Sequence, residues 1–365
     1  MSGRHEAGKE IKIPLAVKIL WVVLGILLVI VLAVYGLVAH FAAKLGGTGD
    51  EPGNAATLEQ ILSDEEGVTA AASLADLIRD SDEETQKAMS EADEALKRQQ
   101  DATIKISKGV TNYLLIGSDR RGTYGYGNSD VMMVVSVNND TGKIHLTSLM
   151  RAMYVTIPAS SGTFSGMLNW AYSMEGPLLT KQTIEDNFKL EIDHYACVDF
   201  NVFTEVVNAI GGVRLDLTEK EVNYINWKTG RYELTAGECL LDGEQALWHA
   251  RNRNQDNDFV RTSRQRDIVE AILKGMRGLS ISELTDLADA VLPYITTDLA
   301  DQPTEILKLL ASAPAMLNYD IDQLMLPVEN MAGESYIGIT HIGGHEMYIV
   351  DWDNNLKKLE EFING

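Results

Sequence analysis

The 365-residue chain has few basic side chains for its length and is strongly acidic overall. It carries 31 lysines and arginines against 53 aspartates and glutamates, which gives a formal net charge of -22. An acidic surface of this kind repels nucleic acid phosphates, and no basic patch of the size that nucleic acid binding requires is visible. We therefore expect no nucleic acid partner.

The sequence also lacks the signatures of several common catalytic sites. It contains no Gly-x-Ser-x-Gly elbow, no Walker phosphate loop and no paired-cysteine zinc pattern. The segment His341-Ile342-Gly343-Gly344-His345 holds two histidines, but its glycines argue against a metal-binding helix. We interpret these histidines as loop residues. No internal repeat or low-complexity tract is present.

Cysteine is scarce, with only Cys197 and Cys239 in the chain. Two cysteines could form one disulfide bond in a secreted domain, or they could stay as two buried thiols. The count does not fix the redox compartment. We favour buried thiols.

One uncharged apolar run is long enough to cross a membrane. At about 1.5 Å per residue, the stretch from Ile19 to Val38 would span the roughly 30 Å hydrocarbon core of a bilayer. A cleaved signal peptide is the alternative, but the run stays apolar to its end instead of stopping at small residues. We therefore expect a transmembrane helix over residues 19–38.

The charges around this run predict its orientation. Four basic residues precede it, namely Arg4, Lys9, Lys12 and Lys18, whereas only Lys44 follows closely. Because basic residues favour the cytoplasmic side, residues 1–18 should lie in the cytoplasm and the rest of the chain outside it. The expected location is the cell membrane, with a single-pass anchor and an extracytoplasmic C-terminal domain.

Residues 39–108 are predicted to be an acidic, partly helical extracytoplasmic linker. The segment opens with Gly46-Gly47-Thr48-Gly49 and then shows helical spacing of leucine and isoleucine at 58–62 and 74–78. A partner-binding or coiled-coil role is one interpretation. We favour a solvated stalk that lifts the following domain off the membrane.

From residue 109 to residue 365, short apolar runs alternate with helical patterns. Six runs bounded by turn residues are typical of buried strands: 113–117, 131–137, 143–149, 195–198, 213–217 and 347–350. Helical spacing occurs at 180–188, 202–210, 243–252, 260–276, 281–292, 304–310 and 354–362. This alternation predicts one α/β domain of about 250 residues, a three-layer sandwich with a mixed central β-sheet.

One short segment reverses the acidic charge of the chain. Residues 251–266 hold five arginines: Arg251, Arg253, Arg261, Arg264 and Arg266. The apolar stripe of the helix that follows, continued backwards by three and four residues, reaches Gln265, Arg264 and Arg261. Arg266 is expected to point away from this stripe.

Inward guanidinium groups are costly unless an anion meets them, and their planar fork suits phosphate oxygens. The alternative is pairing with the protein's own carboxylates, including Asp256 and Asp258 in the same segment. For a single arginine we would choose that alternative. For four arginines on or beside inward faces we favour a polyanionic ligand, and we see no carboxylate partner for Arg261.

Two aspartates flank the first two predicted strands. Asp119 closes the first strand and Asp130 opens the second, so both lie at one sheet edge if the strands pair. Magnesium usually binds through one or two carboxylates plus phosphate, which such an edge could provide. The alternative is that they are ordinary turn or cap residues. Arg151, just after the third strand, could face the same edge.

Several segments, taken together, resemble the LytR-CpsA-Psr family over about residues 109–365. The most specific is Leu241-Asp242-Gly243-Glu244-Gln245-Ala246-Leu247, followed by Ala250-Arg251-Asn252-Arg253 and Arg261-Thr262-Ser263-Arg264-Gln265. The others are Asn112-Tyr113-Leu114-Leu115-Ile116-Gly117-Ser118-Asp119, Ser129-Asp130-Val131-Met132-Met133, Leu168-Asn169-Trp170-Ala171-Tyr172, Ile192-Asp193-His194-Tyr195 and Ala209-Ile210-Gly211-Gly212-Val213.

The resemblance implies a membrane-anchored, extracytoplasmic phosphotransferase of bacterial envelopes. Such an enzyme moves a teichoic acid, capsule or related glycopolymer from a polyprenyl-pyrophosphate carrier onto peptidoglycan, and an apolar tunnel would take the lipid tail. The implied pyrophosphate ligands are Arg151, Arg251, Arg253, Arg261 and Gln265. The implied catalytic residues are Asp119, Asp130 and Arg151, with Asp119 and Asp130 positioning Mg²⁺.

The chain departs from the family pattern at two positions. The family usually has an arginine where this chain has Asn128, and an aspartate where it has Ala152. Arg120 or Arg121 could substitute for the missing arginine, whereas the missing carboxylate leaves the general base unassigned. Two alternatives therefore remain open, a non-catalytic protein that binds polyprenyl pyrophosphates or wall polymers, and a hydrolase of the lipid-linked pyrophosphate.

Overall fold

The computed structural model describes residues 74–119, 126–252 and 258–365, with gaps at 278, 281–282, 284–285, 288–289, 291–294, 303, 306–308, 310–311, 313–314, 329–337 and 343–344. The expected transmembrane helix at 19–38 lies outside the described residues. Within the described ranges, no helix is both long and apolar enough to cross a membrane.

A six-stranded mixed sheet forms the centre of the domain, in the order β10-β3-β2-β1-β6-β9. Its strands are β1 (Val110–Asp119), β2 (Asn128–Asn138), β3 (Lys143–Leu149), β6 (His194–Asp199), β9 (Thr296–Thr297) and β10 (Asp320–Leu326). Strands β1 and β3 each run antiparallel to β2, whereas β6 is parallel to β1 and β10 is parallel to β3. The predicted α/β class with a mixed central sheet is confirmed.

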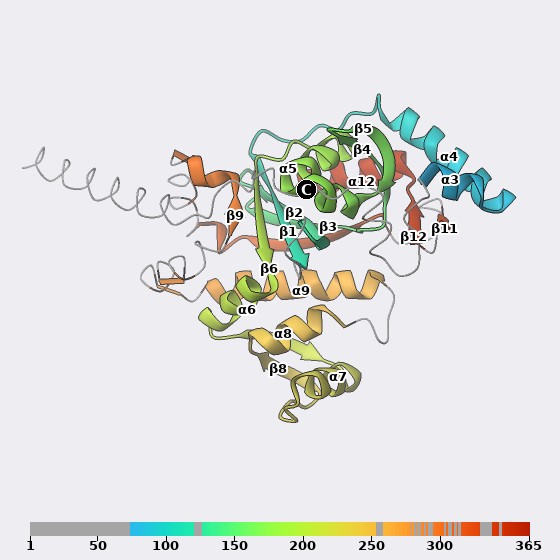
Figure 1. The fold of residues 1–365 in the computed structure, drawn as a ribbon. Helices are drawn as coiled ribbons and strands as arrows, with labels where there is room; N and C mark the ends of the chain where they lie inside the picture. The colour runs from blue at the N-terminus through green and yellow to red at the C-terminus, as the bar shows by residue number, and fades with distance from the viewer. Residues whose placement is uncertain are drawn as a thin grey trace, which may run out of the picture.

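Helices cover both faces of this sheet (Figure 1). The helices are α3 (Leu74–Arg79), α4 (Glu83–Gln99), α5 (Leu168–Phe188), α6 (Phe200–Ala209), α7 (Glu219–Thr229), α8 (Gly243–Ala250), α9 (Asp258–Met276) and α12 (Trp352–Asn364), with a short 3₁₀ turn, η2 (Asp298–Asp301). Helices α5 and α12 lie on one side of the sheet and α9 on the other. Three two-stranded antiparallel sheets complete the fold: β4 (Tyr154–Ala159) with β5 (Gly162–Met167), β7 (Val213–Leu217) with β8 (Gly237–Leu241), and β11 (Gly338–Ile342) with β12 (His345–Ile349).

The alternation of side chains along the strands explains the two covered faces. On β2, Met132 and Val134 belong to the large core under α5, whereas Met133 and Val137 belong to a smaller cluster that includes Val269 of α9. Successive side chains of a strand point to opposite faces, so a run that is apolar at every position needs cover on both sides. The uninterrupted apolar run of β2 therefore requires a helix layer on each face.

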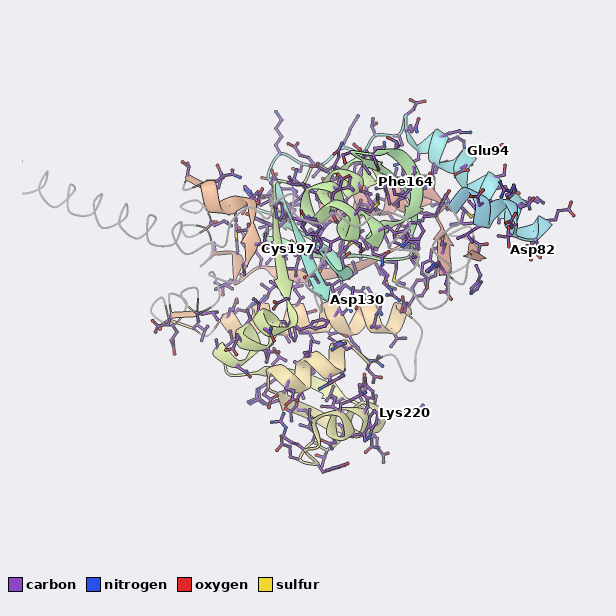
Figure 2. All side chains as sticks on the ribbon, viewed as in Figure 1. Asp82, Glu94, Asp130, Phe164, Cys197 and Lys220 are labelled. Carbon is purple, nitrogen blue, oxygen red and sulfur yellow. The ribbon has the colours of Figure 1, made fainter. Side chains whose placement is uncertain are left out.

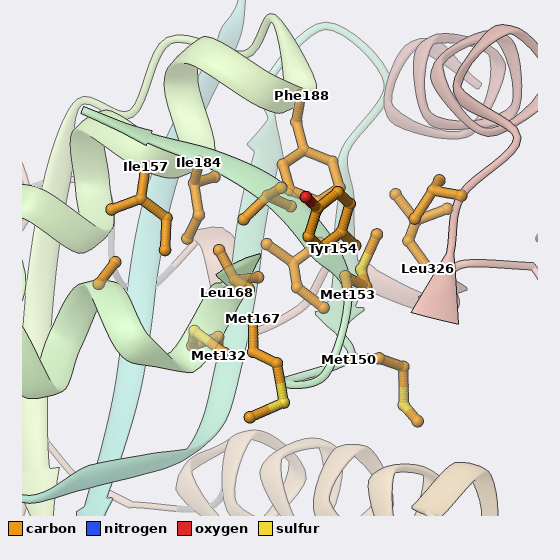
Figure 3. Packing of buried hydrophobic residues seen from close by; sticks show 14 of the residues in the cluster. Met132, Met150, Met153, Tyr154, Ile157, Met167, Leu168, Ile184, Phe188 and Leu326 are labelled. Atoms are coloured by element: carbon orange, nitrogen blue, oxygen red, sulfur yellow. The ribbon is translucent and has the colours of Figure 1, made fainter. Parts of the chain in front are cut away.

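Methionines form much of the core beside the end of β3. Met132, Met153 and Met167 belong to this core together with Leu168, and Met150 joins it from the side of α9, where Thr262 Oγ1 donates to its Sδ over 3.3 Å (Figure 3). Methionine is unbranched and flexible, so it fills irregular apolar space and adapts to different neighbours. This part of the core is therefore more adaptable than one built from branched side chains.

The predicted linker is folded in its last third. Helix α4 buries Met89, Ala92 and Leu96 in the same core as the sheet, and Tyr154 donates a hydrogen bond to Asp93 over 3.0 Å. The expectation of a solvated stalk up to residue 108 is therefore wrong for α4. Apolar residues at helical spacing fit either a stalk or a packed helix, and only the tertiary contacts separate the two.

Other boundaries differ from those expected. Helix α5 begins at Leu168 instead of 180, and its helical spacing is interrupted near Gly176, which has a φ of 73°. Six strands were not predicted: β4, β5, β8, β9, β10 and β11. The two cysteines are free and buried, as expected. The predicted helices at 281–292 and 304–310 lie largely outside the described residues.

Candidate functional site

One edge of the sheet gathers the ends of four strands. Asp119 at the end of β1 is paired with Asn128 at the start of β2, and Ser118 lies beside Asp199 at the end of β6. Strand β3 ends at the same edge, because it also runs antiparallel to β2. The backbone thus brings the predicted positions 119, 130 and 151 to one edge. The side chain of Asp119 lies outside the described residues.

Asp130 occupies a β-bulge at this edge. Gly117 pairs with Val131 but Ser118 pairs with Ser129, so Asp130 is an extra residue with no Cα partner on β1. A bulge breaks the alternation of side chains locally and changes their direction. Figure 2 shows Asp130 on the side of the sheet that faces α9. The bulge explains how Asp130 of β2 reaches Arg151, which follows β3.

Two arginines from distant segments meet a shared carboxylate. Arg151 donates from Nη1 to Asp130 Oδ1 over 3.1 Å and from Nε to Asp258 Oδ2 over 3.3 Å. Arg261 donates from Nη2 to the same Asp258 oxygen over 3.3 Å. Arg261 is only 3% exposed. The result is a partly buried cluster of two guanidinium groups and two carboxylates at the sheet edge.

The partner of Arg261 corrects one prediction from the sequence. Asp258 is the first residue of α9 and lies one turn before Arg261, on the same face of the helix. The expected lack of a carboxylate partner was therefore wrong. The alternative, in which an arginine of the segment pairs with Asp258, applies to Arg261. Arg151 contacts the same carboxylate.

The other two arginines of α9 lie elsewhere. Arg264 is buried and donates to Glu221 of α7 over 2.8 Å and to the carbonyl oxygen of Asn252 over 3.3 Å. Arg266, expected to point outward, is only 7% exposed and donates to Gln323 of β10 over 3.1 Å. The unpredicted strand β10 extends the sheet across this part of α9, which covers the face that would otherwise meet solvent.

The segment 241–247 has a structural role in positioning α8. Asp242 caps the helix by accepting from Gln245 N over 2.9 Å, and Gln245 Oε1 accepts from Asp242 N over 3.1 Å. A Cβ on Gly243 would lie 2.3 Å from the carbonyl oxygen of Thr204 in α6. The motif therefore fixes the start of α8 and its close contact with α6.

Arg251 ends α8 and lies over aromatic rings. Its Cζ is 4.4 Å from the ring centroid of Phe200 and 5.3 Å from that of Trp248. Phe200 directly follows Asp199, which ends β6 beside Ser118, so Arg251 belongs to the same sheet edge. Among the described residues, Arg251 has no carboxylate within ion-pair distance, and its charge is free to meet a ligand.

The remaining predicted residues are placed as follows. Gln265 is buried on α9, one turn beyond Arg261. Arg253 lies outside the described residues, as do Arg120 and Arg121. Ala152 is buried and 7% exposed, so the position where the family has a carboxylate is filled by an apolar side chain here.

Sequence reasoning named Asp258 only as an alternative partner for the arginines and did not assign it to Arg261, and it missed Phe200. The signal for Asp258 was its position one turn before Arg261. Phe200 gave no signal, because its partner is 51 positions away in the sequence. Within the described part of the chain, no three histidine, cysteine, aspartate or glutamate side chains are grouped as a metal site.

Comparison with known proteins gives the family. The LytR_cpsA_psr family profile matches residues 79–358. A curated relative from Enterococcus faecalis, a polyisoprenyl-teichoic acid–peptidoglycan teichoic acid transferase TagU, is 32% identical over 59% of this chain and 70% of its own. The crystal structure of Bacillus subtilis TagV matches with a TM-score of 0.54 and 25% identity, over 71% of this chain and 97% of that one.

A third likeness concerns fold alone. The family protein YwtF (TagT) with bound octaprenyl pyrophosphate lipid matches with a TM-score of 0.51 and 20% identity, over 73% of this chain and 93% of that one. The profile match covers most of the chain, including the sheet, the arginine segment and α8. This chain belongs to the LytR-CpsA-Psr family.

Proposed function

We propose that this chain transfers a glycopolymer from a polyprenyl-pyrophosphate carrier onto a sugar hydroxyl of peptidoglycan. The observation that carries the proposal is the convergence of Arg151 and Arg261 on one sheet edge, with Arg251 on the same edge and without an ion pair among the described residues. Three guanidinium groups suit the two phosphates of a pyrophosphate. The name of the Enterococcus faecalis relative supports a wall polymer as the transferred group.

The reaction needs little covalent work from the protein. The acceptor hydroxyl attacks the phosphorus that carries the polymer, a new P–O bond forms, and the bond to the second phosphate breaks to release lipid monophosphate. Arg151 and Arg261 would neutralise charge that develops on the phosphate oxygens. The hydroxyl proton would pass to a carboxylate of the cluster, Asp130 or Asp258, since Ala152 provides none.

Mg²⁺ fits the chemistry of this edge. Asp130 lies on the bulge beside Arg151, and the backbone of Asp119 ends β1 next to it. Carboxylate oxygens plus a ligand phosphate are what magnesium uses in proteins. When bound, the ion would supply further neutralisation of the phosphate charge. We propose Asp119 and Asp130 as its ligands.

The lipid tail would enter the methionine-rich core. Met150 directly precedes Arg151 and contacts Thr262 of α9, and it belongs to the same core as Met153 and Met167. Flexible thioether side chains can rearrange to admit an apolar chain at lower cost than branched ones.

The expected anchor at 19–38 and the extracytoplasmic location fit a lipid-linked donor and belong to the same proposal. A C-terminal reporter active only outside the cytoplasm should report activity.

A transfer assay tests the function. The full-length chain is mixed with a lipid-linked glycopolymer labelled in the polymer-bound phosphate and with purified peptidoglycan, with and without Mg²⁺. We expect labelled peptidoglycan that requires the metal, a loss of at least tenfold in Arg151→Met, and no change in the exposed control Lys357→Met. Release of label without acceptor would show a hydrolase instead, and donor binding without either product would show a binding protein.

A further inference from the structure

A continuous strip of rings and cations leads from the candidate site to the far end of the domain. Trp248 of α8 lies between two cations, with Arg251 Cζ at 5.3 Å and Lys228 Nζ at 4.9 Å from its ring centroid. Lys228 also lies 4.4 Å from the ring centroid of Trp227 and 5.6 Å from that of Tyr224. With Phe200 under Arg251, the strip joins α6, α8 and α7.

The strip is open to solvent where it ends. Trp227 is 59% exposed and Tyr232, just beyond α7, is 78% exposed. Large exposed aromatic side chains in one place mark a contact surface, because burying them against a partner removes apolar area from water. Helix α7 lies at the end of the molecule opposite α4, with Lys220 at its start (Figure 2). The strip thus extends outward from the site.

The charges around the strip select its ligand. Between Glu219 and Glu244 the chain carries six carboxylates and three basic side chains. Of the basic ones, Arg231 is already paired with Asp242 at 2.7 Å and also contacts Glu233 and Glu244. Among the described residues, Lys228 has no ion pair and is held by rings alone. An acidic rim of this kind repels a polyanionic chain.

We propose that the solvent-accessible part of this strip, defined as Phe200, Trp227, Lys228, Trp248 and Arg251, is a docking track for the uncharged glycan strand of the acceptor. The apolar C–H faces of sugar rings pack on aromatic faces, while Lys228 and Arg251 donate hydrogen bonds to ring-side oxygens. The track ends at Arg251, so a strand lying on it presents a hydroxyl to the sheet edge. The identity of the acceptor rests on the proposed function.

Binding without donor tests the strip separately from transfer. The full-length chain and its Trp227→Ala, Trp227→Tyr and Lys228→Met variants are titrated with a soluble β-linked N-acetylglucosamine oligosaccharide and with polymer-free sacculi. We expect Trp227→Ala to weaken both by about two- to tenfold, and Trp227→Tyr to restore binding. Leu178→Ala, which changes another exposed apolar residue (47%) on α5, is the matched control. Because Trp227 is mostly exposed, its variants should keep the parent melting temperature.

The outcomes separate the two proposals. In the transfer assay, Trp227→Ala should raise KM for peptidoglycan and leave KM for the lipid-linked donor unchanged. If Trp227→Ala binds the oligosaccharide and the sacculi as well as Leu178→Ala does, the proposed docking track is wrong, even if transfer is observed. The proposal would also be wrong if Trp227→Ala weakened binding of a polyglycerol phosphate chain and left binding of the oligosaccharide unchanged. In that case the strip would bind the donor polymer. If sacculi bind and Trp227→Ala weakens that binding, but no polymer is transferred, the proposed function is wrong and the docking track stands.

Discussion

Neighbouring arginines on one helix have different partners and therefore different expected roles. Arg261 and Arg264 are both buried, and among the described residues Arg261 pairs with Asp258 and Arg264 with Glu221. Arg261 shares Asp258 with Arg151 at the sheet edge, whereas Arg264 alone neutralises Glu221 between α9 and α7. Loss of Arg261 leaves Asp258 paired with Arg151. Loss of Arg264 leaves Glu221 without the arginine that neutralises it.

Replacing each of these arginines by methionine should separate binding from stability. Arg261→Met should weaken binding of the lipid pyrophosphate by roughly ten- to a hundredfold, through loss of a charge-assisted hydrogen bond. Arg264→Met should lower the free energy of unfolding by about 3 to 5 kcal/mol and leave affinity unchanged, because it strands a buried carboxylate. Calorimetric titration and urea unfolding measure the two quantities. An unchanged affinity in Arg261→Met, with a stability loss as large as in Arg264→Met, would assign Arg261 to the core.

His249 should make the domain acid-sensitive. Burial lowers the pKa of His249 to about 4, with Glu221 opposing and Arg264 adding to the effect. The unfolded chain binds a proton near pH 6.5 and the folded chain does not, so stability falls as the pH drops from about 6.5 towards 4. Between pH 7 and pH 5 the loss should be about 2 kcal/mol. Urea unfolding at both pH values measures it.

The matched variants for this test are His249→Gln and His341→Gln. The first should flatten the dependence of unfolding free energy on pH in this window, since glutamine does not titrate. The second changes an exposed histidine and should leave the slope as it is. An unchanged slope in His249→Gln would mean that another group is responsible for the acid sensitivity.

At the scale of elements, the close contact of α6 and α8 holds Arg251 in place. Gly243→Ala would put a methyl group against the Thr204 carbonyl, so the start of α8 must shift. We expect a stability loss of about 1 to 3 kcal/mol and weaker binding of the lipid pyrophosphate, since Arg251 ends the same helix. Gly275→Ala on α9 is the control. Its Cβ would meet only the flexible end of Ile210 at 3.3 Å, so the change should be neutral or stabilise by up to about 1 kcal/mol.

At the scale of the whole molecule, α4 closes the main core. Met89→Ala or Leu96→Ala should each lower the free energy of unfolding by about 2 to 5 kcal/mol, because both side chains are almost fully buried. Lys87→Ala on the exposed face should change it by less than about 0.5 kcal/mol. A chain shortened to begin at residue 74 should unfold cooperatively, whereas one that begins at residue 101 should not. If the two shortened chains are equally stable, α4 does not contribute to the core and is part of a stalk.

The sequence by itself predicted the parts whose signals are local. Short apolar runs bounded by turn residues located β1, β2 and β3. Such runs are typical of strands that are covered on both faces. The positions of Asp119, Asp130 and Arg151 at one edge followed from the order of those strands. The order and spacing of the arginine segment and of residues 241–247 carried the family resemblance.

Only the tertiary structure decided which partner each charged residue meets. Asp130 reaches Arg151 through a bulge that has no local signal, and Arg266 is buried because β10, more than 50 residues away, pairs with β3. The aromatic strip joins residues from α6, α7 and α8 in the same way. Periodicity along a chain fixes which side of an element is buried. The identity of the neighbour on that side depends on pairing between distant segments, which no local pattern records.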